Sequence, residues 1–424
     1  MNTNTRKPKR ASEPAAIAAS ALLCLAWINS AGAADVSLKP GDRIAIVGNT
    51  FADQLRVHGY FETLLLQRTQ GNAVSVRNLG WAGDMLTARD RPTNFPSEES
   101  TLTAHKTDVI IACFGMGESF AGQKGLDSFR KDLEAFIASH AGKKYNGKSA
   151  PRVILISPIA CEDHGVRTRG VAATFLAALG VRTPGRDQRN ADLQAYTRVM
   201  REFAADRRIP FVDLYQPTLE LMNADGPKLT TNGIHLNEYG YWVVSRWMAD
   251  ALLPGEVTWR VEVDARAKAV DSKGLSIAKL EKDDRGLHLT VKEQGFPWLA
   301  PPKGIQPHAG VAAQRDTVVF KNLPKGRYTL SIEGQHVATA TSDEWARGVL
   351  IDASPAHDDA DAMRTAEIGK KEHLRDRWKA LNQVHIVGER RGSPSGRALP
   401  GELIEFNKMA IEKDAALAVP VTFK

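Results

Sequence analysis

Residues 43–69 have the pattern of a buried strand followed at once by a helix. Residues 43–48 form a short apolar run that ends in Gly-Asn-Thr, as expected of a strand bounded by turn residues. Apolar residues then recur at helical spacing to residue 69. Thr50 therefore stands where the strand ends and the helix begins. Open α/β sheets place their ligands there, and the free N–H groups of a helix start attract negative charge. Thr50 is the first candidate functional residue.

Short apolar segments alternate with helical ones as far as residue 252. Further strands are expected at 75–79, 108–114, 152–157 and 211–214, and further helices at 125–140, 190–206 and 238–252. The run at 108–114 is apolar without alternation, which is typical of a central parallel strand covered on both faces. This alternation predicts an α/β domain, with a parallel five-stranded sheet and helices on both faces.

The pattern changes near residue 255. Between 257 and 352 apolar and polar residues alternate between turns and no long helix is indicated, which predicts a small antiparallel β domain. Residues 356–382 and 402–416 have helical patterns. We therefore expect an α/β domain at 35–255, a β-rich domain at 256–352 and a C-terminal helical segment at 353–424. That segment should pack back on the α/β domain, because its apolar residues Phe406, Met409, Ile411 and Leu417 need a surface to cover.

Residues 1–34 have the character of a secretory signal peptide. Four basic residues precede an apolar stretch at 15–28, and Ala-Gly-Ala at 31–33 offers a cleavage site. A retained membrane anchor is the alternative, although the stretch is shorter than the ~20 residues of a span. The net charge is +7, and loss of this segment, with four basic residues and one acid, leaves +4. Without a dense basic stripe, that charge predicts no nucleic-acid partner. The protein is thus expected to be secreted or periplasmic, with no stable membrane span after cleavage.

The cysteine and histidine residues give little reason to expect a disulfide or a metal site. Cys113 and Cys161 should lie near the ends of neighbouring strands, and because disulfide geometry is narrow we favour two free thiols over a disulfide. Residues 161–164 read Cys-Glu-Asp-His, but these ligand types are adjacent and no second cluster complements them. We predict no metal and no other cofactor.

Four turns that follow strands should meet at one edge of the sheet. They read Gly-Asn-Thr at 48–50, Asn-Leu-Gly-Trp-Ala-Gly-Asp at 78–84, Gly-Met-Gly-Glu at 115–118 and Asn-Gly-Ile-His at 232–235. In order and spacing they resemble the blocks of the SGNH, or GDSL, hydrolase family over about residues 43–253. The resemblance implies a flavodoxin-like three-layer α/β/α fold and an ester hydrolase that uses no cofactor.

The resemblance also implies a role for each block. Thr50 takes the place of the nucleophilic serine, and His235 that of the base. The N–H groups of Gly83 and Thr50 would bind the oxyanion. Gly117 stands where the family has an oxyanion-binding asparagine, and Asn232 where it has the aspartate that orients the histidine. The first, third and last blocks therefore depart from the family pattern.

Each departure predicts a weaker catalyst. The extra methyl group of Thr50 stiffens the side chain and crowds the approach to a carbonyl. Gly117 offers no side-chain donor, and the loss of one oxyanion donor typically slows turnover by ~10²–10³. Asn232 can orient His235 but brings no negative charge, a change that costs ~10⁴ in the serine-protease template.

Another acid could replace Asn232 as the partner of His235. Glu118 and Glu162 follow strands at the same sheet edge, so both are possible alternative acids. Glu118 could equally well cap nearby backbone groups.

Purely structural roles compete with the catalytic ones. Thr50 could be only the N-cap of the helix that follows it. Gly83 and Gly117 could be only turn glycines. Asn232 could form an Asx turn, and His235 could fix the start of the last helix.

These observations favour a secreted carboxylic ester hydrolase that transfers an acyl group to water. Its substrate would be a small-molecule or glycan ester. Secretion and the added β domain favour an acylated carbohydrate, by analogy with other folds of this kind. A catalytically weak or inactive binding protein for a glycan or a protein partner is the alternative, and a structural subunit of an envelope assembly is a third.

Overall fold

The computed structural model describes residues 38–389 except 70–71, 90, 92–94, 165–184, 255–257, 267, 285, 294–296, 298 and 313–315. The signal peptide expected at 1–34 and the apolar residues beyond 389 lie outside the described residues. None of the described helices has the length and apolarity needed to cross a membrane.

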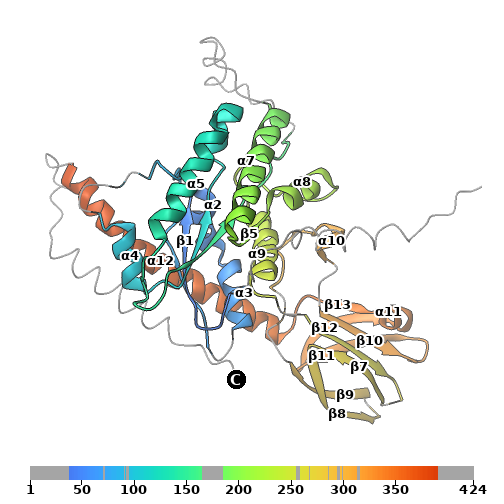
Figure 1. Cartoon of the computed structure of the whole chain (residues 1–424). Helices are drawn as coiled ribbons and strands as arrows, with labels where there is room; N and C mark the ends of the chain where they lie inside the picture. Colours follow the sequence, from blue (N-terminus) through green and yellow to red (C-terminus); the bar gives the residue numbers. More distant parts are fainter. Residues whose placement is uncertain are drawn as a thin grey trace, which may run out of the picture.

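A parallel five-stranded sheet forms the centre of the larger domain, as predicted (Figure 1). Its strands are β1 (Arg43–Gly48), β2 (Ser75–Asn78), β3 (Val109–Cys113), β4 (Arg152–Ile156) and β5 (Phe211–Val212), in the order β2-β1-β3-β4-β5. This is the flavodoxin-like order. β1 lies between β2 and β3, so the turn after β1 is near the middle of the sheet edge.

Helices cover both faces of this sheet. One face packs on α2 (Thr50–His58), α3 (Tyr60–Arg68) and α9 (Glu238–Leu252), and the other on α4 (Glu98–His105), α5 (Leu126–His140) and α7 (Arg186–Arg207). η1 (Glu118–Gly125) precedes α5, and α8 (Tyr215–Asn223) follows β5. Alternate residues of β1 supply both cores, because successive side chains of a strand point to opposite faces. The three-layer arrangement that was predicted is confirmed.

The helix expected at 51–69 is broken into α2 and α3 at Gly59. Gly59 has φ 67°, a left-handed conformation that glycine adopts without strain. A Cβ at this position would lie 2.8 Å from Ile368 Cγ1, so a helix from the end of the chain packs against this corner. The sequence pattern alone does not reveal this contact.

The β-rich region forms several small sheets with their own apolar core, which contains Trp259 and Trp345. Strands β6 (Arg260–Asp264), β7 (Lys268–Lys273), β10 (Asp316–Lys321) and β13 (Val349–Ile351) make one sheet, in the order β13-β10-β6-β7. β8 (Leu275–Asp283) pairs with β9 (Gly286–Glu293), and β11 (Arg327–Ile332) with β12 (Gln335–Thr341). All pairs are antiparallel except β6 with β10. The short helix α11 (Ser342–Arg347) belongs to this region, whereas α10 (Ala309–Ala312) lies beside α9, where Val311 packs on the core of the α/β domain (Figure 1).

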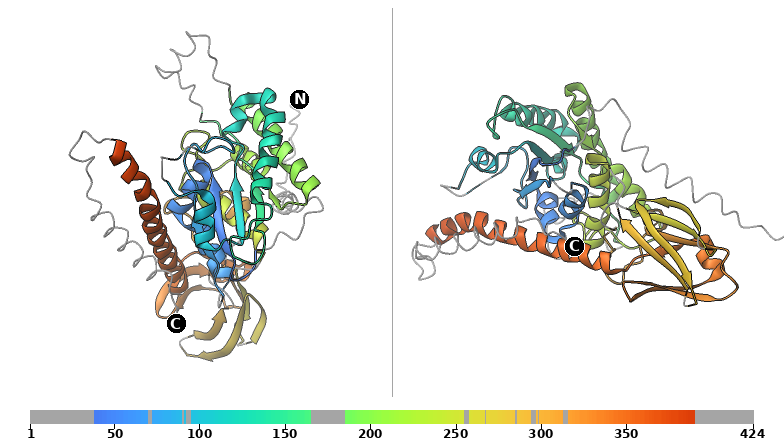
Figure 2. Two further views of the ribbon diagram at one scale, coloured as in Figure 1. Left: turned by 60° about the vertical axis from the view of Figure 1, so that its left-hand side comes forward. Right: turned by 90° about the horizontal axis from the view of Figure 1, so that it is seen from below.

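One long helix, α12 (Pro355–Glu389), leaves the β-rich region and runs past the α/β domain (Figure 2). Arg364 donates a hydrogen bond to the carbonyl of His58 at 3.0 Å. Glu62 of α3 is fully buried and forms ion pairs with Lys370 at 3.0 Å and Lys371 at 2.6 Å. The described part of the C-terminal segment therefore lies on the α/β domain. The division of the chain into domains stays a prediction, as does any contact made by the four apolar residues of the tail.

The two described cysteines, Cys113 and Cys161, are free thiols, as favoured from the sequence. Burial raises the pKa of the Cys113 thiol well above its usual range, so this thiol is not a reactive one.

Candidate active site

The turn after β1 presents Thr50 at the first position of α2. Asn49 is the N-cap, and its Oδ1 accepts a hydrogen bond from the Phe51 N–H at 3.0 Å. The alternative that Thr50 is the cap is therefore wrong. The Thr50 side chain is half-buried, and its hydroxyl has no hydrogen-bond partner among the described residues. An unbonded hydroxyl at a helix start fits the role of nucleophile that the resemblance implies, and that role stays a prediction.

The turn after β2 packs on the first turn of α2. Asn78 Nδ2 donates to the carbonyl of Ala52 at 2.7 Å, and Asn78 Oδ1 accepts the Gly80 N–H at 2.9 Å. A Cβ on Gly80 would lie 2.4 Å from the nitrogen of Asp53, so only glycine allows this approach. The second block is thereby held against the helix that begins with Thr50.

Gly83 occupies the exposed tip of that turn. Its φ is 87°, and the Asp84 N–H bonds the carbonyl of Trp81 at 3.0 Å to close the turn. The Gly83 N–H donates no hydrogen bond within the described part of the chain. A free backbone donor here fits the role in oxyanion binding that the resemblance implies.

Gly117 faces the side chain of Met85. Its backbone is in the ordinary helical region, with φ −66°, so its conformation does not require glycine. A Cβ there would lie 2.8 Å from Met85 Cγ and 3.1 Å from Sδ. Met85 therefore occupies the space in which an asparagine side chain would begin.

Substitution of Gly117 by asparagine alone should leave turnover of 4-nitrophenyl acetate unchanged or lower it, because the new side chain collides with Met85. The double change Gly117→Asn with Met85→Ala should raise turnover by about 10-fold or more, within the ~10²–10³ that an oxyanion donor contributes. Met85→Ala alone is the control. A single Gly117→Asn variant as fast as the double variant would contradict this steric account.

Glu118 is bound to backbone groups of two turns. Its Oε1 accepts the Leu86 N–H and its Oε2 the Gly115 N–H, both at 2.8 Å. Burial raises the pKa of this carboxyl despite those hydrogen bonds. Both oxygens are engaged, and neither forms a hydrogen bond or an ion pair with His235 among the described residues. Glu118 joins the turn after β2 to the end of β3, and its role as the alternative acid stays a prediction.

Glu162 braces the loop that carries Asn232 and His235. Its buried carboxylate accepts the N–H groups of Leu229 at 3.1 Å and Thr230 at 2.8 Å, and the Thr230 hydroxyl at 2.6 Å. It also lies 3.4 Å from a ring nitrogen of His164. Glu162 thus lies beside His164, and its carboxylate forms no hydrogen bond or ion pair with His235 in the part of the chain that the structure describes. It positions the loop, and its role as the alternative acid stays a prediction.

Asn232 and His235 contact each other directly. Asn232 Oδ1 accepts the N–H groups of Ile234 at 3.3 Å and His235 at 3.0 Å, which is the Asx turn considered from the sequence. These bonds fix the orientation of the amide, so Nδ2 is the atom that lies 2.9 Å from His235 Nδ1. Since Nδ2 can only donate, Nδ1 must accept, and the ring proton is then on Nε2. A general base needs the opposite tautomer.

The two halves of the expected site meet through α2 and α9. Tyr241 of α9 stacks on Phe51 with ring centroids 5.8 Å apart, and its hydroxyl donates to the Phe51 carbonyl at 3.2 Å. Thr50 and His235 share no hydrogen bond among the described residues, and the pairing of these two residues stays a prediction. Such bonds often form only once substrate is bound.

Three features of this edge were not identified from the sequence. Asn49 as the cap could have been found, because asparagine is among the best N-cap residues. No local sequence signal indicates that Met85 packs on Gly117 or that Glu162 binds the backbone of the loop before His235. Both features depend on contacts between loops that are distant in sequence. No group of three or more histidine, cysteine, aspartate or glutamate side chains suited to a metal occurs among the described residues.

Comparison with known proteins gives one family. Residues 41–243 match the GDSL-like lipase/acylhydrolase family. No curated protein matches the chain. Among solved structures, a gut microbial diltiazem-metabolizing enzyme is 18% identical, with a TM-score of 0.62 over 91% of each chain. This likeness extends through the β-rich region and concerns the fold alone.

Two further solved structures cover less of the chain. A putative arylesterase from Agrobacterium tumefaciens is 14% identical over 49% of this chain and 96% of its own, with a TM-score of 0.35. A peptidoglycan O-acetylesterase is 14% identical over 42% of this chain and 46% of its own, with a TM-score of 0.30.

Proposed function

Residues 41–243 belong to the GDSL-like lipase/acylhydrolase family, and on that premise we propose that this protein is a slow carboxylic ester hydrolase. The observation that carries the proposal is the unbonded Thr50 hydroxyl at the start of α2, beside the turn that presents the free Gly83 N–H. We further propose that residues 1–34 direct the protein to the periplasm or the exterior, and that its substrate is an acylated carbohydrate.

The proposed reaction is acyl transfer to water through a covalent intermediate. Thr50 Oγ1 attacks the ester carbonyl, its proton passes to His235 Nε2, and the alcohol leaves with that proton. The N–H groups of Thr50 and Gly83 donate to the oxyanion that forms. Water then attacks the acyl-threonine ester and gives a proton to His235, which passes it to Thr50 Oγ1 as the bond to the acyl group breaks and the acid leaves. Nε2 accepts a proton only after His235 changes tautomer. This change adds to the free-energy barrier of each turnover.

A non-catalytic binding protein is the second candidate. The contact between Asn232 and His235 favours it, because it holds the ring in the tautomer that cannot act as a base. The same turns could still bind an ester or a glycan in its ground state, since binding and transition-state stabilisation are separable.

Hydrolysis of 4-nitrophenyl acetate by the mature protein separates the two candidates. Thr50→Ala and His235→Ala should each reduce the rate to the uncatalysed background, because they remove the nucleophile and the base. Thr50→Ser should raise kcat by about 5- to 10-fold, because a lost methyl group that relieves about 1 kcal/mol of crowding has an effect of this size. Equal rates in all four proteins would remove Thr50 from catalysis and leave the binding protein as the better account.

A further inference from the structure

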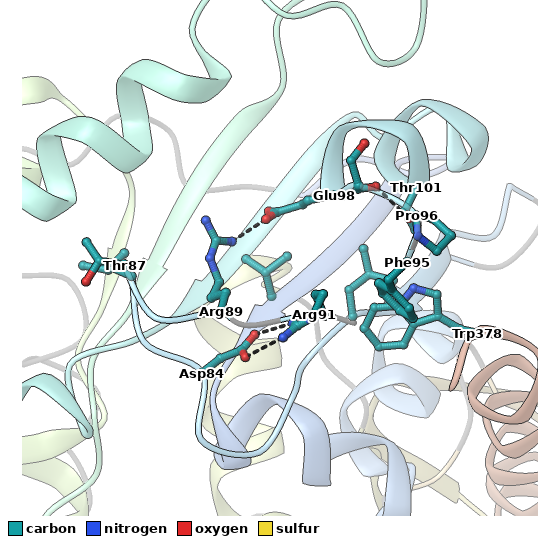
Figure 3. A pocket seen from close by; sticks show the side chains of 13 residues that line it. Asp84, Thr87, Arg89, Arg91, Phe95, Pro96, Glu98, Thr101 and Trp378 are labelled. Carbon is teal, nitrogen blue, oxygen red and sulfur yellow. Dashed lines mark hydrogen bonds and ion pairs between the residues drawn. The ribbon is translucent and has the colours of Figure 1, made fainter. Parts of the chain in front are cut away.

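A cavity of about 410 Å³ lies beside the turn that carries Gly83 (Figure 3). Val47 and Leu79, at the ends of β1 and β2, line it on the sheet side, and Trp378 of α12 lines it on the other. Asp84, which directly follows Gly83, is part of the lining. The cavity has the size of a small-molecule site and adjoins the expected oxyanion donor in sequence and in space.

Its charged side chains neutralise one another. Arg91 forms a two-pronged pair with Asp84, at 2.9 and 2.6 Å. Arg89 and Glu98 form a second ion pair. Two arginines and two carboxylates leave no net charge, so the cavity does not select a charged ligand. They do supply many hydrogen-bonding atoms around the opening.

Aromatic rings form the wall nearest α12. Trp378 meets Phe95 edge-on with centroids 5.4 Å apart, and Trp81 with centroids 5.5 Å apart. The guanidinium of Arg91 lies 4.5 Å from the centroid of the Trp81 ring. Trp378 thus belongs to an aromatic cluster that borders the cavity.

Two buried polar atoms in the lining have no hydrogen-bond partner among the described residues. They are Trp378 Nε1, a donor, and Glu98 Oε1, an acceptor. His140 Nε2 is 3.9 Å from Glu98 Oε1, beyond hydrogen-bond distance, and burial lowers the pKa of His140 to about 4, so this ring is neutral. Buried polar groups are normally paired, so a ligand that reaches both atoms would pair a donor and an acceptor that the free protein leaves unpaired.

We propose that this cavity binds the neutral carbohydrate part of the substrate, an inference that rests on the proposed ester hydrolase function. A sugar offers hydroxyl groups that both donate and accept, and C–H faces that pack on aromatic rings. An alkyl or acyl chain would fill the aromatic part but leave Trp378 Nε1 and Glu98 Oε1 unpaired, which is unfavourable. An anionic ligand would have to displace Asp84 or Glu98 from its arginine.

Binding of disaccharides without an ester bond tests this inference. Cellobiose, xylobiose and N,N′-diacetylchitobiose are titrated separately into the mature protein, with calorimetry and tryptophan fluorescence as readouts. At least one should bind saturably. Trp378→Phe keeps a ring but loses the donor, and should weaken binding by about 5- to 10-fold, the worth of one hydrogen bond. Trp378→Ala should abolish binding. Trp247→Phe, a change on α9 away from the cavity, is the matched control and should bind as the parent does.

Two results would overturn the inference. One is no saturable binding of any of the three disaccharides, whether or not 1-hexanol binds, and the other is equal affinity in Trp378→Ala. The outcome is independent of the test of function. The probes contain no ester, and the titrations give the same answer in a His235→Ala background, whereas the proposed hydrolase fails only if Thr50→Ala retains the parent rate.

Discussion

Replacement of Asn232 by aspartate should raise kcat/KM for 4-nitrophenyl acetate by about 10²- to 10⁴-fold. The upper bound is the ~10⁴ that the reverse change costs in the serine-protease template. No other single substitution in the protein is expected to increase its activity as much.

The reason lies in the direction of one hydrogen bond. Asn232 now donates to His235 Nδ1 at 2.9 Å, which leaves the proton on Nε2. An aspartate in the same place keeps one oxygen for the N–H groups of Ile234 and His235 and presents the other to Nδ1. That oxygen can only accept, so Nδ1 must carry the proton and Nε2 is free to take one from Thr50. The carboxylate also stabilises the imidazolium that forms during the reaction.

Two controls make this prediction specific. Asn232→Ala removes the hydrogen bond from Asn232 to His235 Nδ1 without adding a charge. It should give a much smaller gain than Asn232→Asp. Asn232→Asp combined with His235→Ala should show no gain at all, because the aspartate acts only through the ring. A rate for Asn232→Asp within about twofold of the parent would mean that the tautomer does not limit this enzyme.

Most of the α/β domain could be predicted from local pattern. The runs at 43–48 and 108–114 are apolar without alternation, so their place inside a parallel sheet follows from the sequence. The sequence-based predictions were incomplete where a segment that is distant in sequence packs against the local structure. The break at Gly59 comes from its left-handed backbone, and Ile368 of α12 packs against this corner, a contact that the helical period does not reveal.

The candidate site shows the same division. The strand-end rule predicted Thr50, Gly83 and His235 as site residues, and their roles stay predictions. Gly83 and His235 are exposed, and Thr50, the first residue of α2, is half-buried. It could not assign Glu118 and Glu162, because a glutamate after a strand can bind substrate or backbone N–H groups, and only the three-dimensional contacts distinguish these roles. The cavity beside Asp84 could not be predicted at all, since Trp378 comes from the far end of the described chain.

The long helix α12, which carries Trp378, is held to the α/β domain by a buried charge cluster. Glu62 is fully buried and lies between Lys370 at 3.0 Å and Lys371 at 2.6 Å, and Lys370 also contacts Glu367 at 2.7 Å. Removal of one partner from a buried ion pair typically costs about 3–5 kcal/mol, because it leaves the other charge buried and uncompensated. Glu62→Ala should therefore lower the free energy of unfolding by about this amount, measured by urea denaturation.

A matched variant separates charge from packing at this contact. The quadruple change Glu62→Leu, Glu367→Leu, Lys370→Met, Lys371→Met removes the cluster as a whole and should be close to neutral, because apolar groups of similar volume replace buried ion pairs without loss. Hydrogen exchange should show earlier opening of α12 in Glu62→Ala and not in the quadruple variant. If Glu62→Ala loses less than about 1 kcal/mol, the worth of a surface pair, the cluster does not hold the helix.

The acid dependence of stability gives an independent test of the same cluster. Burial opposes the charge on Glu62, but Lys370 and Lys371 outweigh it and hold the pKa of the carboxyl at about 2, below its ordinary value of 4.5. A carboxyl whose pKa is depressed by folding stabilises the protein above the unfolded pKa, and this contribution is lost as the pH falls towards the folded pKa. Between about pH 4.5 and 2 the parent should therefore lose stability relative to Glu62→Gln, whose side chain does not titrate. Identical slopes for the two proteins in that range would mean that Glu62 is not charged in the folded state. The energy that fixes α12, and with it Trp378 at the cavity, would then have to come from packing alone.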